Sequence, residues 1–200
     1  MIMNNINLNE LRDRAYKTAC KHGFHDEELS NEHCLCLVIS ELMEAVEADR
    51  NGKLGKKCKS RFDMDYNRYP VLVEEEKRFK SSFEKNVKDS LPDELADAAI
   101  RLFDLYGLRE IELDTDAFDD ATIGEYAITY QRKTFTESIM HITVSISSNI
   151  DVIGRSCMVP DILLLYIFGL AKHLEIDLFW HIKQKMRYNE LREKMHGKKY

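Results

Sequence analysis

The sequence predicts an all-α helical bundle, and three observations support this fold class. The chain has only 3 prolines and 8 glycines among its 200 residues, too few for the many tight turns of a β-sandwich or β-barrel. Strong helix formers such as leucine, glutamate and lysine are abundant. Several long segments carry apolar residues at helical spacing. We expect a single α-helical domain over residues 1–200, with residues 53–90 as an insertion or lid.

The first two predicted helices lie in the first quarter of the chain. Helical spacing over residues 8–20, followed by Gly23 as a stop signal, predicts the first helix. The second begins at an N-cap, Ser30 or Asn31, and ends near Asn51. Its apolar stripe consists of Leu35, Val38, Leu42 and Val46.

The insertion and the next helix follow. The basic composition of residues 53–61 predicts a flexible, solvated segment, residues 62–73 have no clear period, and residues 74–88 predict a charged helix. Ser90 as N-cap, with proline in the first turn and an acid three residues after the cap, then predicts a helix that ends near Arg109. The apolar stripe of this helix consists of Leu95, Ala98, Ala99, Leu102, Phe103 and Tyr106.

The last part of the chain predicts three more helices. Residues 122–149 predict one long helix, although their middle is rich in serine, threonine and isoleucine and resembles a strand. Pro160 opens an apolar helix, and the final helix extends from Asp177 to Gly197. The most apolar run, residues 162–171, has about half the length needed to cross a bilayer, so it predicts a buried helix.

Charge and cysteine usage restrict the function classes. A net charge of −6 argues against a nucleic-acid binder, which needs a basic face, but not against a small phosphorylated ligand. The 5 cysteines include no C-x-x-C pair and predict neither a disulfide framework nor a zinc site. Because the first residues also lack the pattern of a signal peptide, we expect a cytoplasmic protein with no membrane partner.

Two pairs of carboxylates border the apolar stripes of the two strongest helices. Glu41 and Glu44 are three residues apart, as are Glu94 and Asp97, and this spacing places side chains on neighbouring helix faces. If the stripes pack together, four carboxylates face one another and require a cation. An all-oxygen ligand set favours Mg²⁺, with Mn²⁺ as a substitute. The alternative is that each pair forms a solvated helix face.

The carboxyl end supplies cations and an amide. Lys185 and Asn189 are one helical turn apart, Arg192 follows, and Lys198 belongs to a polar tail. Such groups suit a bound phosphate and sugar. The alternative is that basic residues near a helix C-terminus complement the helix dipole and that the tail is only solvated.

Three motifs, in this order, resemble the MazG-like all-α nucleoside triphosphate pyrophosphohydrolases. The motifs are Ser40-Glu-Leu-Met-Glu44, Asp93-Glu-Leu-Ala-Asp97 continuing to Asp104, and Lys185-x-x-x-Asn189-x-x-Arg192. The resemblance implies that Glu41, Glu44, Glu94 and Asp97 bind magnesium, and that Lys185 and Asn189 lie around the substrate. We expect Arg192 and Lys198 to pair with phosphate oxygens of the substrate as well.

The chain departs from the family pattern in two places. Ser40 stands where the first glutamate is usual, and the spacing between the two acidic motifs is longer than usual because of residues 53–90. We expect this insertion to lie over the site as a lid or against a partner subunit. The resemblance also implies a homo-oligomer, either a dimer or a tetramer.

The expected activity is magnesium-dependent hydrolysis of a nucleoside triphosphate to nucleoside monophosphate and pyrophosphate, as housekeeping of the nucleotide pool. Glu41 is our choice for the carboxylate that accepts the proton of the attacking water. The alternative function is a non-catalytic helical module that senses nucleotide or binds a protein partner. A carboxylate-bridged di-iron bundle is excluded because its Glu-x-x-His motif occurs only once, at Glu193 and His196.

Overall fold

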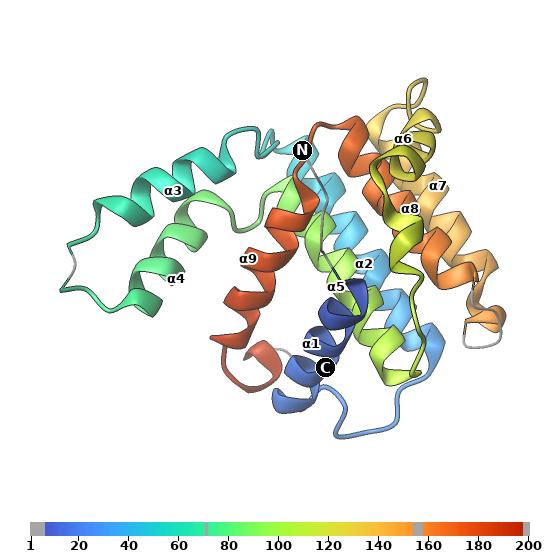
Figure 1. Ribbon diagram of the computed structural model, residues 1–200, viewed down its shortest axis with the longest axis horizontal. Coiled ribbons are helices and arrows are strands. Elements are labelled where there is room, and N and C mark those ends of the chain that lie inside the picture. The colour runs from blue at the N-terminus through green and yellow to red at the C-terminus, as the bar shows by residue number, and fades with distance from the viewer. Residues whose placement is uncertain (1–6, 71, 154–157, 198–200) are drawn as a thin grey trace.

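The computed structural model describes residues 7–70, 72–153 and 158–197. The described residues form helices and no β-strand (Figure 1). The predicted all-α fold class is therefore confirmed for the described chain. Within it, no helix is long and apolar enough to span a membrane. The α-helices are α1 (Leu8–Lys21), α2 (Asn31–Arg50), α3 (Cys58–Arg68), α4 (Glu75–Asn86), α5 (Leu91–Leu108), α6 (Asp120–Ile128), α7 (Phe135–Ser148), α8 (Met158–His173) and α9 (Leu178–Glu190), with short 3₁₀ turns η1 (Thr115–Phe118), η2 (Ile150–Val152) and η3 (Lys194–Gly197).

Helix α5 is the centre of the bundle and packs against α1, α2, α8 and α9. Its predicted apolar stripe is buried, and Leu95, Leu102 and Phe103 have no exposed surface. Of the predicted stripe of α2, Leu35, Val38 and Leu42 are buried and Val46 is partly buried. Because burial of these two stripes drives α2 against α5, the acidic faces that border the stripes are brought close together.

The predicted helix over 122–149 is wrong, because the chain turns between α6 and α7. The Thr134 hydroxyl accepts a hydrogen bond from the amide of Glu137, and the Glu137 carboxylate accepts a hydrogen bond from the amide of Thr134. This capping box satisfies the free N–H groups of a new helix and so begins α7. The Thr-x-x-Glu spacing was present in the sequence and is the signal that would have divided the segment.

Gly124 on α6 and Gly169 on α8 both lie where these two helices pack, but they differ in the space available for a side chain. A Cβ on Gly169 would lie 2.7 Å from the Cβ of Tyr126 and 2.8 Å from its carbonyl carbon, whereas a Cβ on Gly124 would meet only the Nζ of Lys172 at 3.5 Å and its Cε at 3.9 Å. We expect Gly169→Ala to lower the free energy of unfolding by about 1–3 kcal/mol through overpacking. Gly124→Ala should be neutral or stabilising by up to about 1 kcal/mol, because alanine favours the helix. Urea unfolding of both variants measures the difference, and equal effects would contradict this packing.

The insertion forms a helical hairpin, α3 and α4, that extends away from the bundle (Figure 1). The prediction of a flexible segment over residues 53–61 is wrong from Cys58 onward. Helix α3 begins at Cys58, and its side chains Cys58 and Phe62 are buried. A second apolar cluster joins the hairpin to α9 and consists of Cys58, Phe62, Phe79, Phe83, Val87 and Tyr188. The apolar spacing of α3 was hidden among charged neighbours.

The end of the chain folds back on the loop after α1. Helix α9 ends at Glu190 and not at Gly197 as predicted. Its C-cap is Leu191, and further on the Met195 amide donates to the carbonyl of His22 at 2.9 Å, with a φ of 52° at Met195. Arg192 follows the C-cap, lines the same cleft as residues of α1 and α5, and has its guanidinium carbon 5.9 Å from the ring centre of Tyr188 on α9.

Candidate functional site

Three carboxylates from two helices converge where α2 packs on α5. Glu41 lies on α2, and Glu94 and Asp97 lie on α5; one oxygen atom of each is within 4.8 Å of the others. Glu41 and Glu94 are each only 4% exposed. The pKa of Glu94 is raised to about 8, chiefly by desolvation and also by the negative charges of Asp93, Asp97 and Glu44, against the opposing effect of Lys185. Crowded, desolvated carboxylates of this kind are the ligand set that a hard divalent cation requires.

Glu44 is not among the three clustered carboxylates. It lies one turn after Glu41 and is exposed, although it is near enough to raise the pKa of Glu94. A three-residue step turns a helix by about 300°, so Glu44 lies about 60° away from the face that meets α5. Its role as a metal ligand stays a prediction.

Lys185 is buried within the acidic group and not at its mouth. Its ammonium nitrogen lies 2.7 Å from Oδ2 of Asp93 and 2.7 Å from Oδ2 of Asp97. Burial lowers the pKa of Lys185, but Asp97, Asp93 and Glu94 outweigh this effect and leave the pKa raised, so the side chain is a cation. Lys185 therefore neutralises part of the negative charge that Glu94 and Asp97 bring together.

Asp93 is a site residue that sequence reasoning missed, because it was assigned only to the helix N-terminus. It is fully buried and accepts hydrogen bonds from the amide of Asp89 at 3.0 Å and from Lys185 at 2.7 Å. Desolvation raises the pKa of Asp93 to about 6, with Lys185 opposing and Asp97 adding to the shift. The four-residue step from Asp93 to Asp97, which places both on one helix face, was the available signal.

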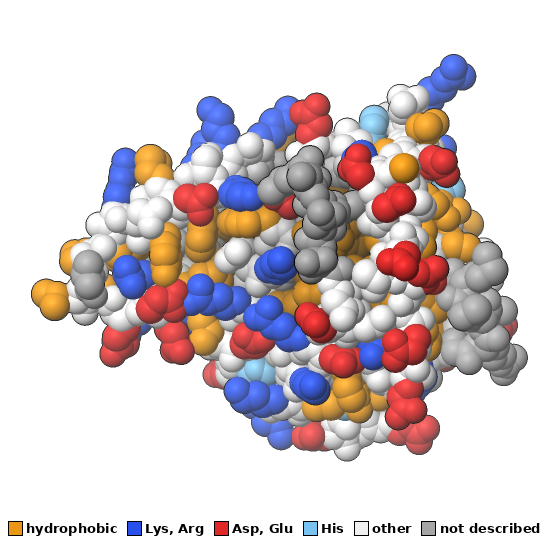
Figure 2. Space-filling model, in the orientation of Figure 1, with side chains coloured by type: hydrophobic (Ala, Val, Ile, Leu, Met, Phe, Trp, Pro, Cys, Tyr) orange, Lys and Arg blue, Asp and Glu red, His pale blue; other side chains and the backbone are white. Residues whose placement is uncertain are grey.

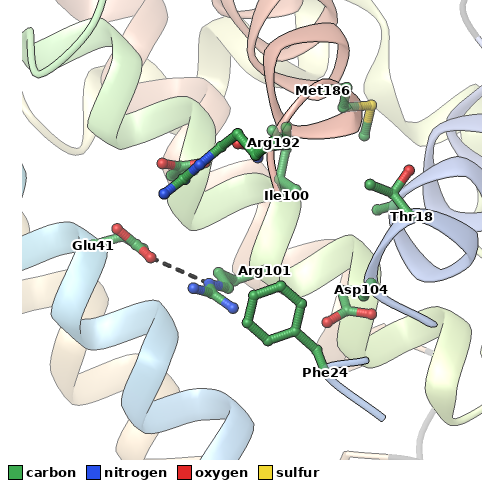
Figure 3. Close-up of a pocket in the computed structure, with 12 residues that line it drawn as sticks. Thr18, Phe24, Glu41, Ile100, Arg101, Asp104, Met186 and Arg192 are labelled. Carbon is green, nitrogen blue, oxygen red and sulfur yellow. Dashed lines mark hydrogen bonds and ion pairs between the residues drawn. The ribbon is translucent and has the colours of Figure 1, made fainter. Parts of the chain in front are cut away.

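Arg101 supplies the second cation of the site. It follows Asp97 by one turn of α5, and its Nε donates to Oε1 of Glu41 at 3.2 Å across the α2–α5 contact (Figure 3). Its guanidinium carbon also lies 5.6 Å from the ring centre of Phe24. Arg101 thus joins the carboxylate cluster to the loop after α1.

An open cleft begins at this cluster and is lined by both polar and less polar side chains, with Glu41, Arg101 and Arg192 toward one end and Phe24, Thr18, Met186 and Asp104 toward the other (Figure 3). The space within its walls is about 60 Å³, and the cleft opens to solvent beyond it. Helices α1, α5 and α9 form most of its walls. Its polar lining consists of Glu41, Asp97, Arg101, Asp104, Asn189 and Arg192, and its less polar lining consists of Ala15, Thr18, Ala19, Phe24, Ile100 and Met186.

Two of the predicted substrate contacts line this cleft. Asn189 and Arg192 do so from the end of α9 and the turn after it, and Oδ1 of Asn189 is buried without a hydrogen-bond partner in the described chain. A buried polar atom without a partner is costly unless a ligand or water completes it. Lys198 lies outside the described residues. The structure thus brings Glu41, Asp97, Asn189 and Arg192 to one cleft, with Lys185 buried behind it.

The surface drawn in Figure 2 carries acidic and basic side chains interspersed with one another. A nucleic-acid backbone is bound by a continuous basic track, whereas acidic side chains lie among the basic ones on the described part of this face. Comparison with known proteins finds no protein-family model, no curated protein and no solved structure that matches this chain. Its function has to be argued from the site itself.

Proposed function

We propose that this chain is a magnesium-dependent nucleoside triphosphate pyrophosphohydrolase of the MazG-like kind. The observation that carries the proposal is the group formed by Glu41, Glu94 and Asp97, whose oxygen atoms lie within 4.8 Å of one another. This group stands at one end of a cleft lined by both polar and less polar side chains. A triphosphate needs polar and charged side chains, and a nucleoside needs less polar ones.

The donor set fits magnesium, because its ligands are carboxylates without histidine or cysteine. A magnesium ion there would supply positive charge to the triphosphate oxygens and lower the pKa of a coordinated water. Glu41 accepts the proton that the attacking water loses when the bond between the α- and β-phosphates is broken. Nucleoside monophosphate and pyrophosphate are the products.

The basic side chains and the amide of the site divide into two roles. Arg192 and Asn189 line the cleft and are placed to bind phosphate oxygens and the sugar. Lys185 is only 5% exposed and already contacts two carboxylates, which favours a positioning role over direct phosphate binding. It holds Asp97 toward the other two carboxylates.

One observation favours the alternative, a non-catalytic helical module that senses nucleotide. The pairs Lys185–Asp97 and Arg101–Glu41 already balance part of the acidic charge, so the cluster can be stable without a metal ion. A module of this kind would bind nucleotide without turnover and would be indifferent to magnesium.

Product analysis separates the two functions. The protein is incubated with canonical and modified nucleoside triphosphates and magnesium, and the products are separated by anion exchange. We expect monophosphate and pyrophosphate in equal amounts, and none when a chelator replaces magnesium. Absence of turnover with every nucleotide, for folded protein in excess magnesium, would contradict the enzyme and favour the module.

A further inference from the structure

Asp104 marks the end of the cleft away from Glu41, in the part lined by Phe24 and Thr18 (Figure 3). It lies two turns along α5 from Asp97, so it is too far along the helix to join the carboxylate cluster. Its side chain is 15% exposed and also lines a second hollow that continues past Phe24 and Arg101. The carboxylate is therefore accessible from the cleft.

His25 fixes the orientation of this carboxylate. Nε2 of His25 lies 2.7 Å from Oδ1 of Asp104, and the His25 side chain is only 7% exposed. Nδ1 of His25 is buried without a hydrogen-bond partner in the described chain, and the hydrogen bond that holds the Asp104 carboxylate is made by Oδ1 and not by Oδ2. One carboxylate oxygen is thus held by an imidazole, and the other is left for a ligand.

We propose that Asp104 selects the nucleobase and that the cleft favours bases with an amino group at C4 of a pyrimidine or C6 of a purine, cytosine and adenine, over their carbonyl counterparts uracil and hypoxanthine. This inference rests on the proposed function, since it assumes that the triphosphate lies at the carboxylate cluster. The base then occupies the end of the cleft lined by Phe24 and Thr18, with Asp104 at its edge. His25 is a positioning residue.

The chemistry of a carboxylate decides the preference. An ionised carboxylate only accepts hydrogen bonds, so an amino group held at this position is bound, whereas a carbonyl oxygen held there faces it without a donor. The neighbouring ring N–H of uracil or hypoxanthine reaches the carboxylate only if the base shifts in the cleft. The other polar side chains near Phe24 are Thr18 and Arg101, and Nε of Arg101 donates to Oε1 of Glu41. Asp104 is the side chain best placed to distinguish the two kinds of base.

The test compares nucleotides that differ only in the amino or carbonyl group. Dissociation constants are measured by calorimetry for the non-hydrolysable α,β-methylene analogues of CTP and UTP in magnesium, and kcat/KM is measured for CTP against UTP and ATP against ITP. We expect at least about a 10-fold preference for the amino base in each pair, the effect of one unsatisfied polar contact. Asp104→Asn, whose amide also donates, should reduce the preference to less than about threefold, and His25→Leu should lower it in part.

Glu125→Gln is the matched control, because Glu125 is exposed on α6 and does not line the cleft. It should leave both ratios unchanged. Equal binding of the CTP and UTP analogues by the wild type would overturn the inference without any variant. An unchanged ratio in folded Asp104→Asn would also overturn it. If hydrolysis is absent but the binding preference is present, the proposed function fails while the base selection stands.

Discussion

Glu94→Gln is expected to abolish magnesium-dependent hydrolysis and at the same time to stabilise the metal-free protein at alkaline pH. The loss of activity should be at least about 100-fold, because a ligand is removed where even supporting groups of a metal site matter 10- to 100-fold. The gain in stability follows from the burial of Glu94, whose pKa is raised from 4.5 to about 8. Glutamine has the shape of the protonated acid and never has to ionise in this environment.

The sign of the pH dependence follows from proton linkage. Between pH 4.5 and 8 the folded protein keeps a proton on Glu94 that the unfolded chain releases. The stabilisation is therefore complete below about pH 4.5 and is lost as the pH rises through the folded pKa of about 8. Relative to the wild type, Glu94→Gln should gain stability across this interval and keep a constant advantage above it.

Thermal unfolding at pH 5 and pH 9 measures the effect of pH on the metal-free protein when a chelator is present. The same measurement with excess magnesium in place of the chelator measures the effect of the metal ion. Magnesium should raise the Tm of the wild type at pH 9, because it binds the ionised carboxylates of the folded state. It should have little effect on the variant. Glu47→Gln is the control, since Glu47 is exposed on α2 and bonded to Arg50 and Asn51. A magnesium-dependent rise in the Tm of Glu94→Gln, together with retained hydrolysis, would show that Glu94 is not a ligand.

The second large effect is expected from Lys185→Met, which removes the buried cation and keeps an apolar side chain of similar length. Asp93 and Asp97 each lie 2.7 Å from the lysine nitrogen and would lose their counter-charge. Removing one partner of a buried ion pair costs about 3–5 kcal/mol, and we expect a loss of that size in urea unfolding at pH 7. The loss should shrink toward pH 5, where the uncompensated carboxylates take up protons.

Two comparisons make this prediction specific to the buried charge. Lys183→Met changes an exposed lysine on the same helix and should alter stability by less than about 0.5 kcal/mol. Asp93→Asn added to Lys185→Met removes one uncompensated carboxylate and should recover part of the loss. A loss below about 1 kcal/mol for Lys185→Met alone would mean that water or a bound ion replaces the lysine.

Much of the candidate site was predictable because helical periodicity is a local property. The apolar stripes of residues 31–50 and 91–108 predict which faces are buried, and Glu41, Glu94 and Asp97 border those faces. Asp93 was missed because its position in a first helical turn already had an explanation in the helix dipole. His25 was missed because it lies in a loop, where no periodicity relates it to Asp104.

The sequence by itself determined the all-helical class, the bounds of α1, α2, α4 and α5, and the faces on which the carboxylates lie, since each depends on residues within a few turns of one another. Only the tertiary structure decided that Glu44 faces solvent, that Lys185 is buried between Asp93 and Asp97, and that Arg192 lines the cleft. These features depend on which helices meet and at what angle. That outcome is set by packing between segments far apart in the chain, which no local pattern records.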